Sequence, residues 1–206
     1  MSTPGDRPAE TLLMQQAYEQ LQDGRFEDAV ETFSASLLVG PHDADARRGR
    51  GLAYLQLKRW ALAAADFAAA RDLAPDDADN WIDLGVSLAM DNKIYPAIEA
   101  LETLLATQPD CERGHLTLGM LHLTLGAIPK GRAELERALA CRPTREQRRF
   151  IESMLHEQSQ LDRKRFYRPD FEALHRQHAL DASTSLTKRL RQWCTRRWGR
   201  RASEHS

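Results

Sequence analysis

The chain of 206 residues has no long apolar segment. No stretch approaches the roughly 18 uninterrupted apolar residues of a membrane-spanning helix. The opening residues, 1–8, lack the apolar centre that a secretory signal needs. A hydrophobic content of 42% is nevertheless enough to bury one substantial core. We therefore expect a soluble, cytoplasmic protein with one folded domain and appendages.

Cysteine is scarce. Cys111, Cys141 and Cys194 are odd in number and widely spaced along the chain. Such a set argues against a disulfide framework and against a zinc site. We expect three ordinary reduced thiols.

Motifs of the common catalytic sites are also missing. The sequence has no phosphate-binding glycine loop, nucleophile elbow or metalloprotease motif. His115 with His122, and Glu172 with His175 and His178, have the spacing of partial metal sites. They lack a closing fourth ligand, so solvated helix residues explain them better. We predict no enzyme activity, no metal and no cofactor.

What the sequence does contain is a ladder of prolines, Pro41, Pro75, Pro109 and Pro143, each 34 residues from the next. This period is typical of helical repeats that stack into an α-solenoid. Small residues are required where two helices cross closely. With the periods counted from Glu10, Ala44, Ala78 and Glu112, they recur at the eighth and twentieth positions. They are Ala17, Gly51, Gly85 and Gly119, and Ala29, Ala63, Ala97 and Gly131. A four-helix bundle is the alternative, and it would need this register by chance.

The third period carries the clearest family pattern. It reads Trp81, Ile82, Asp83, Leu84 and Gly85, then Ala97, Leu101 and Pro109. These residues resemble the tetratricopeptide repeat family. The resemblance implies an all-α fold, an α-solenoid of four repeats within 10–143, at 10–43, 44–77, 78–111 and 112–145. We expect a flexible N-terminus at 1–9, a capping helix at 144–165 and a basic C-terminal extension with a helical tail at 166–206.

The net charge of −1 conceals two regions of opposite sign. Residues 1–143 contain 22 acidic and 14 basic residues, whereas residues 144–206 contain 8 and 15. From Leu186 onward the pattern predicts a basic amphipathic helix. Its expected contacts are Lys188, Arg189, Arg191, Trp193, Arg196, Arg197 and Trp198. Such a helix suits an anionic membrane surface, an acidic partner or the acidic repeats, and a solvated tail is the plain alternative. Nucleic acid is not expected, because the acidic repeats oppose a duplex.

The resemblance also implies which side chains line a concave groove, because first helices of the family face inward at their second, fifth, ninth, twelfth and thirteenth positions. The predicted partner-binding residues are Met14, Tyr18, Leu21, Arg48, Leu52, Leu55, Ile82, Val86, Met90, Arg113, Leu116, Met120 and Leu123. This strip is almost wholly apolar, and an apolar strip open to water marks a binding site. The alternative is plain core, covered by the chain's own tail or by a second copy. Arg48 and Arg113 are expected either to orient a ligand or to be solvated.

Some tetratricopeptide co-chaperones bind the acidic C-terminus of heat-shock chaperones through a two-carboxylate clamp of Lys, Asn, Asn, Lys and Arg. The matching positions here hold Met14, Tyr18, Gly49, Asp79 and Asp83, which lack the required donors. The apolar groove and capping helix instead resemble bacterial type III secretion chaperones of hydrophobic translocators. Those chaperones usually carry three repeats and no long basic tail.

We therefore expect a module that binds an extended or helical apolar segment of a partner protein. One use is a chaperone of a hydrophobic secreted client. The other is an assembly scaffold whose basic tail meets a membrane surface or an acidic partner. The identity of the client and the oligomeric state stay open.

Overall fold

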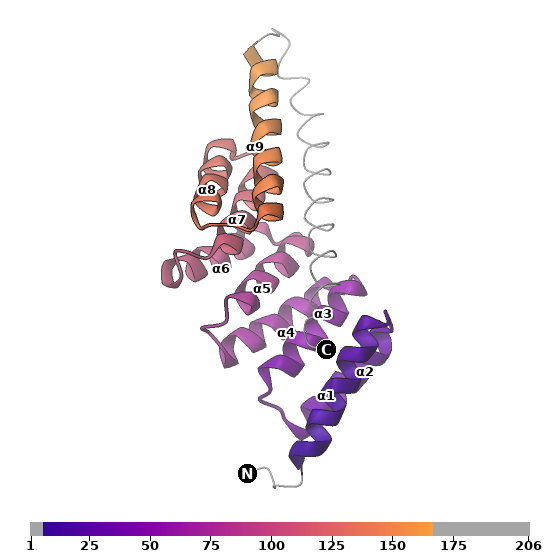
Figure 1. Ribbon diagram of the computed structural model, residues 1–206. Helices are drawn as coiled ribbons and strands as arrows, with labels where there is room; N and C mark the ends of the chain where they lie inside the picture. The colour runs from indigo at the N-terminus through magenta and orange to yellow at the C-terminus, as the bar shows by residue number, and fades with distance from the viewer. Residues whose placement is uncertain (1–5, 167–206) are drawn as a thin grey trace. The chain divides into compact units, whose positions relative to one another are not determined.

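The computed structural model describes residues 6–166, which are helical and contain no strand (Figure 1). The described helices are α1 (Asp6–Gln22), α2 (Phe26–Val39), α3 (Ala44–Gln56), α4 (Trp60–Leu73), α5 (Ala78–Met90), α6 (Ile94–Thr107), α7 (Glu112–Thr124), α8 (Ile128–Ala140) and α9 (Arg145–Phe166). They divide into two compact units, with the border after Ala100, inside α6. The all-α fold expected from the sequence is confirmed.

The turns inside the helix pairs share one backbone feature. Each contains a residue with positive φ, namely Gly24 (+75°), Lys58 (+58°), Asn92 (+63°) and Gly126 (+75°). The next residue in each turn donates its N–H to a carbonyl of the preceding helix, for example Arg25 to Gln20 at 2.8 Å. This is a Schellman C-cap, in which a left-handed residue ends a helix. The four positions are again 34 residues apart, although only two of them are glycine.

The ladder prolines lie just after the second helices of the pairs and do more than end them. The carbonyls of the first three accept hydrogen bonds from the fourth residue of the next pair. The donors are Arg47 Nη2 to Pro41 at 2.9 Å, Trp81 Nε1 to Pro75 at 2.8 Å and His115 Nε2 to Pro109 at 2.8 Å. Three different side chains thus perform the same task at one repeat position.

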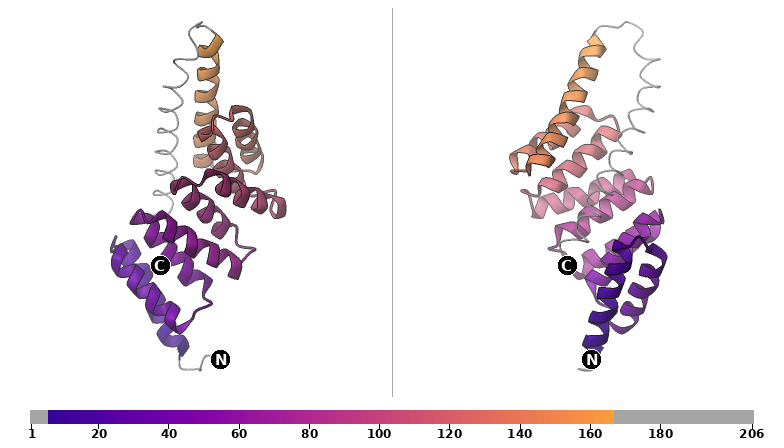
Figure 2. Two further views of the ribbon diagram at one scale, coloured as in Figure 1. Left: turned by 180° about the vertical axis from the view of Figure 1, so that it is seen from behind. Right: turned by 45° about the vertical axis from the view of Figure 1, so that its right-hand side comes forward.

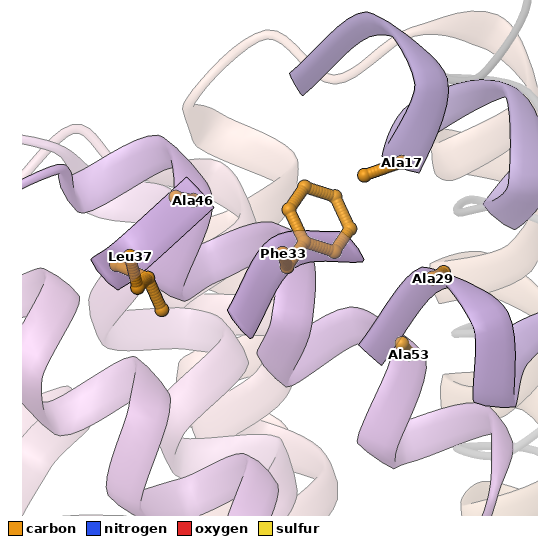
Figure 3. Close-up of a cluster of buried hydrophobic side chains, with 6 residues drawn as sticks. All are labelled: Ala17, Ala29, Phe33, Leu37, Ala46 and Ala53. Carbon is orange, nitrogen blue, oxygen red and sulfur yellow. The ribbon is translucent and has the colours of Figure 1, made fainter. Parts of the chain in front are cut away.

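In the first unit, the helices lie as antiparallel pairs, as α1 and α2 show in both views of Figure 2. A core cluster joins α1, α2 and α3 around the ring of Phe33 (Figure 3). Its members are Ala17, Ala29, Phe33, Leu37, Ala46 and Ala53. The next pair repeats this design around Phe67, where a Cβ on Gly51 would lie 2.9 Å from the ring. The small residues of the sequence pattern are therefore the places where helix backbones meet large side chains.

In the second unit, α7 and α8 approach most closely at two glycines. A Cβ on Gly131 would lie 3.0 Å from the carbonyl oxygen of Gly119. Helix α9 begins with a capping box, in which Thr144 N–H donates to Gln147 Oε1 at 2.7 Å and Gln147 N–H donates to Thr144 Oγ1 at 3.3 Å. Gln147 also donates through Nε2 to Glu112 Oε2 of α7 at 2.9 Å. Ile151 and Met154 of α9 are buried.

Helix α1 begins at Asp6, inside the segment that we expected to be flexible. Pro8 lies in its first turn, where a helix needs no backbone donor, so proline does not delay the start. None of the helices within residues 6–166 is both long and apolar enough to cross a membrane. The expected tail contacts from Lys188 to Trp198 lie outside the described residues, as do Glu172, His175, His178 and Cys194.

Candidate protein-binding face of the first helices

The predicted partner-binding residues lie on α1, α3 and α5 of the first unit and on α7 of the second, and we call these side chains the first-helix face. They differ in exposure. Met14, Tyr18, Leu21, Arg48, Leu52, Met90 and Arg113 are partly exposed, whereas Leu55, Ile82, Val86, Leu116, Met120 and Leu123 are buried. The apolar part of the face that meets solvent is therefore narrower than the sequence indicated, and most of it lies in the first unit.

Tyr18 connects α1 to both of its neighbours. Its ring stands edge-on to the ring of Phe33, with centroids 5.2 Å apart. Its hydroxyl donates to the carbonyl oxygen of Asp45 at the start of α3, at 3.3 Å. Burial, helped by the negative charge of Asp45, raises the pKa of Tyr18 to about 12. The phenol therefore stays neutral at any physiological pH and presents an apolar edge to the face.

Arg48 of α3 is surrounded by carboxylates on α5 and at its N-cap. Its Nε donates to Asp83 Oδ2 at 3.1 Å, and its Nη2 donates to Asp79 Oδ2 at 3.1 Å. The carboxylate of Asp77, just before α5, lies 3.8 Å from Nη1. The side chain of Arg48 is 15% exposed and that of Asp83 is 3% exposed. Burial disfavours the charged guanidinium, but Asp83, Asp79 and Asp77 outweigh it and raise the pKa of Arg48 further.

Sequence reasoning missed this network. We had expected Arg48 to orient a ligand or to be solvated, and Asp79 and Asp83 only to repel a carboxylate. The structure directs these charges toward one another, so Arg48 acts between the second and third repeats. A signal was available in the sequence. Arg48 is at the fifth position of its repeat, and Asp79 and Asp83 are at the second and sixth positions of the next. The two acids therefore lie about one turn apart on the adjacent first helix, on either side of the position that corresponds to the cation.

In the second unit, the face on α7 is largely core. Leu123 packs against Gly131 of α8, because a Cβ added to this glycine would lie 2.7 Å from the Cγ of Leu123. Leu116 and Met120 are at most 1% exposed. An acidic substitution at Met120 would therefore test folding rather than partner binding.

The two histidines of α7 have separate surroundings. His115 Nδ1 lies 2.7 Å from Glu134 Oε2 of α8, and Glu134 also pairs with Arg137. His122 is buried, and this burial, together with nearby Lys130, lowers its pKa. Across the part of the chain that the structure describes, no group of three or more His, Cys, Asp or Glu side chains could hold a metal ion.

A family model described as tetratricopeptide repeat matches residues 14–78 and 96–146, which is more than half of the chain. The chain therefore belongs to the tetratricopeptide repeat family, as the residue pattern indicated. Repeats of this family are interaction modules that present an extended surface to a protein partner.

Three known proteins show how far the likeness extends. Cellulose synthase 1 operon protein C of Komagataeibacter xylinus is 31% identical over 153 residues, which cover 68% of this chain and 12% of that protein. The structure of TTC0263, a thermophilic TPR protein in Thermus thermophilus, has a TM-score of 0.60 at 20% identity, over 84% of this chain and 98% of that one. The first TPR of Spaghetti (RPAP3), bound to the HSP90 peptide SRMEEVD, has a TM-score of 0.53 at 19% identity, over 57% and 93%.

These likenesses have limits that matter for function. At the identities of the two solved structures, the similarity concerns the fold alone. The chain spans between 6% and 16% of the length of the curated relatives that it matches. The relatives therefore establish the class of repeat, and the partner must be argued from this chain's own residues.

Proposed function

We propose that this protein binds an apolar segment of a partner protein, extended or helical, on the first-helix face of its first unit. One observation carries the proposal. Tyr18, Leu52 and Met90 are partly exposed there, while the cation of the same face, Arg48, is directed to Asp79 and Asp83 of the adjacent repeat. A surface with apolar side chains and an internally matched cation favours an apolar ligand over an anionic one.

The charges also argue against a peptide that ends in acidic residues, such as the HSP90 peptide bound by the first TPR of Spaghetti. Asp79 and Asp83 occupy positions at which a carboxylate clamp needs cations, and Gly49 is covered by the ring of Phe33. A terminal carboxylate would meet negative charge at this face. We accordingly propose no carboxylate-clamp partner. We also propose no catalysis and no cofactor.

Within this function, we propose the role of a holding chaperone for a hydrophobic client, such as a protein exported by a type III secretion system. Exposed apolar anchors on a rigid helical array suit this task, because they cover a client segment without requiring it to fold. The repeat boundaries 10–43, 44–77, 78–111 and 112–145 and the cytoplasmic location remain part of this proposal.

The experiment compares affinity capture from the native cell by the unmodified chain, Leu52→Asp and Leu62→Asp. Leu52 is on the face, whereas Leu62 lies near the start of α4 and is 48% exposed. Proteins whose recovery, measured by quantitative mass spectrometry, falls with Leu52→Asp and not with Leu62→Asp are partners of the face. Circular dichroism must show equal helix content in all three proteins. Equal recovery of every protein with the two variants would refute the proposal.

A second candidate is an assembly scaffold, which the opposite charges of 1–143 and 144–206 favour. In this function the basic segment 186–201 meets an anionic membrane surface or an acidic protein. Sedimentation with phosphatidylserine vesicles at low and high salt tests the membrane form. Salt-sensitive binding that disappears when residues 184–206 are removed would support it, and no binding at low salt would exclude it.

A further inference from the structure

Two cysteines lie at the same end of the helix pair α7–α8. Cys111 is the N-cap residue of α7, and Cys141 is the C-cap residue of α8. The helices are joined at their other ends by the short turn around Gly126, so the residue before α7 and the residue after α8 lie at the open end. Both thiols are free and partly exposed. Our expectation from the sequence treated them as unrelated.

The contacts between α7 and α8 place the two cysteines at nearly the same level. Gly119 faces Gly131, and His115 bonds Glu134 one turn closer to the open end. With a rise of about 1.5 Å per residue, Cys111 lies about 12 Å beyond Gly119 and Cys141 about 15 Å beyond Gly131. The two cysteines therefore differ by only about 3 Å along the helix pair.

By their spacing, the two cysteines continue the sides of α7 and α8 that meet one another. Cys111 precedes His115 by four residues and Gly119 by eight, which continues the stripe of α7 that meets α8. Cys141 follows the buried Ala138 by three residues and Glu134 by seven, which continues the matching stripe of α8. The Sγ of Cys111 lies 3.4 Å from the position of a Cβ on Gly114, which Leu104 and Leu105 of α6 also approach.

The electrostatic surroundings agree with this proximity. Burial raises the pKa of the Cys141 thiol, and the negative charges of Asp110, Glu112 and Cys111 raise it further. Cys111 and the two acids that flank it therefore act directly on Cys141.

We propose that Cys111 and Cys141 form an intramolecular disulfide when the protein meets a peroxide. Both residues are cap residues with non-helical backbone, so a local adjustment can bring their Cα atoms to the roughly 4.4–6.8 Å that a disulfide requires. The bond links the residue that precedes α7 to the residue that follows α8. It is independent of the function proposed for the first unit.

The chemistry proceeds in two balanced steps. The Cys111 thiolate attacks one oxygen of hydrogen peroxide, the O–O bond breaks, and the sulfur is oxidised to a sulfenic acid. The second oxygen leaves as hydroxide, which takes up the proton that the Cys111 thiol released and becomes water. The Cys141 sulfur then attacks the Cys111 sulfur. The S–S bond forms, the S–O bond breaks, and hydroxide leaves with the thiol proton as a second water. Two thiols and one peroxide give one disulfide and two waters.

The test uses the full chain with Cys194→Ser, treated with hydrogen peroxide, alkylated and digested for mass spectrometry without reduction. The expected product joins the peptides of Cys111 and Cys141 within a single chain and has two hydrogens fewer than their sum. In guanidinium chloride the same linkage should form about tenfold more slowly, because the folded helix pair no longer holds the thiols together. Equal rates in the folded and unfolded chain, or linkage only between chains, would overturn the proposal.

Three variants make the assignment specific. Cys141→Ser should leave a sulfenic acid at Cys111 that dimedone traps, and absence of the dimedone adduct at Cys111 would contradict the first step. Asp110→Asn removes one charge that raises the pKa of Cys141, so the disulfide should form roughly twofold faster near neutral pH. An unchanged or slower rate in Asp110→Asn would show that the acids do not act on this reaction. Cys111→Ser, the cross-link control, should stay folded, because serine is a favoured N-cap residue.

Discussion

The guanidinium of Arg48 on α3 donates from Nε to Oδ2 of Asp83 on α5 at 3.1 Å. This contact joins the first helix of the second repeat to the first helix of the third. Because the side chain of Asp83 is only 3% exposed, its charge depends on such a partner. A residue that the sequence assigned to ligand binding thus contributes to the cohesion of the repeats.

Removal of this cation should destabilise the protein strongly. We expect Arg48→Met to lower the free energy of unfolding by about 2–4 kcal/mol, because carboxylates of low exposure lose their guanidinium. Arg25→Met is the matched control, since Arg25 and Asp23 are 53% and 62% exposed, and it should cost less than about 0.5 kcal/mol. Urea unfolding measures both. Equal losses in the two variants would contradict a special role for Arg48.

The hydrogen bond from Trp81 to the carbonyl of Pro75 can be removed while an aromatic ring is kept. Trp81→Phe deletes the Nε1–H donor and should lower the free energy of unfolding by about 1 kcal/mol more than Trp60→Phe does. Chemical denaturation followed by circular dichroism provides the comparison. If Trp60→Phe is equally costly, the loss of ring size explains the effect, and the proline carbonyl does not.

Lys58 has a left-handed backbone that glycine adopts without strain. Lys58→Gly should therefore raise the free energy of unfolding by about 0.5–1 kcal/mol, even though glycine increases the entropy of the unfolded chain. Gly126→Ala, at the same position of the fourth repeat, should lower it by about 1 kcal/mol. Thermal unfolding midpoints should move in opposite directions. A lower midpoint for Lys58→Gly would show that its side chain matters more than its backbone.

His122 should make stability depend on pH. Its pKa is lowered in the folded protein, chiefly by burial and then by Lys130, although Glu134 and Glu102 act in the opposite sense. The unfolded chain therefore takes up a proton first, and stability present above about pH 6.5 declines as the pH falls toward the folded pKa. His122→Gln should reduce the fall in urea midpoint between pH 7.5 and 5.5. An identical fall in the variant would assign the effect to other groups.

The all-α repeat fold followed from the sequence because the responsible signals are local. A proline after each second helix, small residues at the crossings and apolar residues at helical spacing act within one repeat, and the repeat recurs. Gly51 and Gly131 accordingly occupy the helix crossings that their spacing indicated, where they face Phe67 and Leu123. The left-handed turn position escaped notice because Lys58 and Asn92 replace the glycine that would have revealed it.

The candidate face was less predictable. The periodic pattern placed Tyr18, Leu52, Leu55 and Leu123 in equivalent roles, but the structure leaves Tyr18 and Leu52 partly exposed and buries the other two. The assignment of all these residues to partner binding stays a prediction. The exposure of each side chain depends on which residues of the adjacent helices pack against it. A pattern shared by all repeats does not contain this difference between them.

The sequence by itself determined the class of fold, its period and the register of its helices, since these depend on local propensity and on packing that every repeat shares. Only the tertiary structure decided that Arg48 meets Asp83, that Met120 is core, and that Cys111 lies level with Cys141. Each of these depends on side chains from different helices whose separation is set by the crossing of those helices. The spacing of residues along the sequence does not give the distance between side chains on different helices.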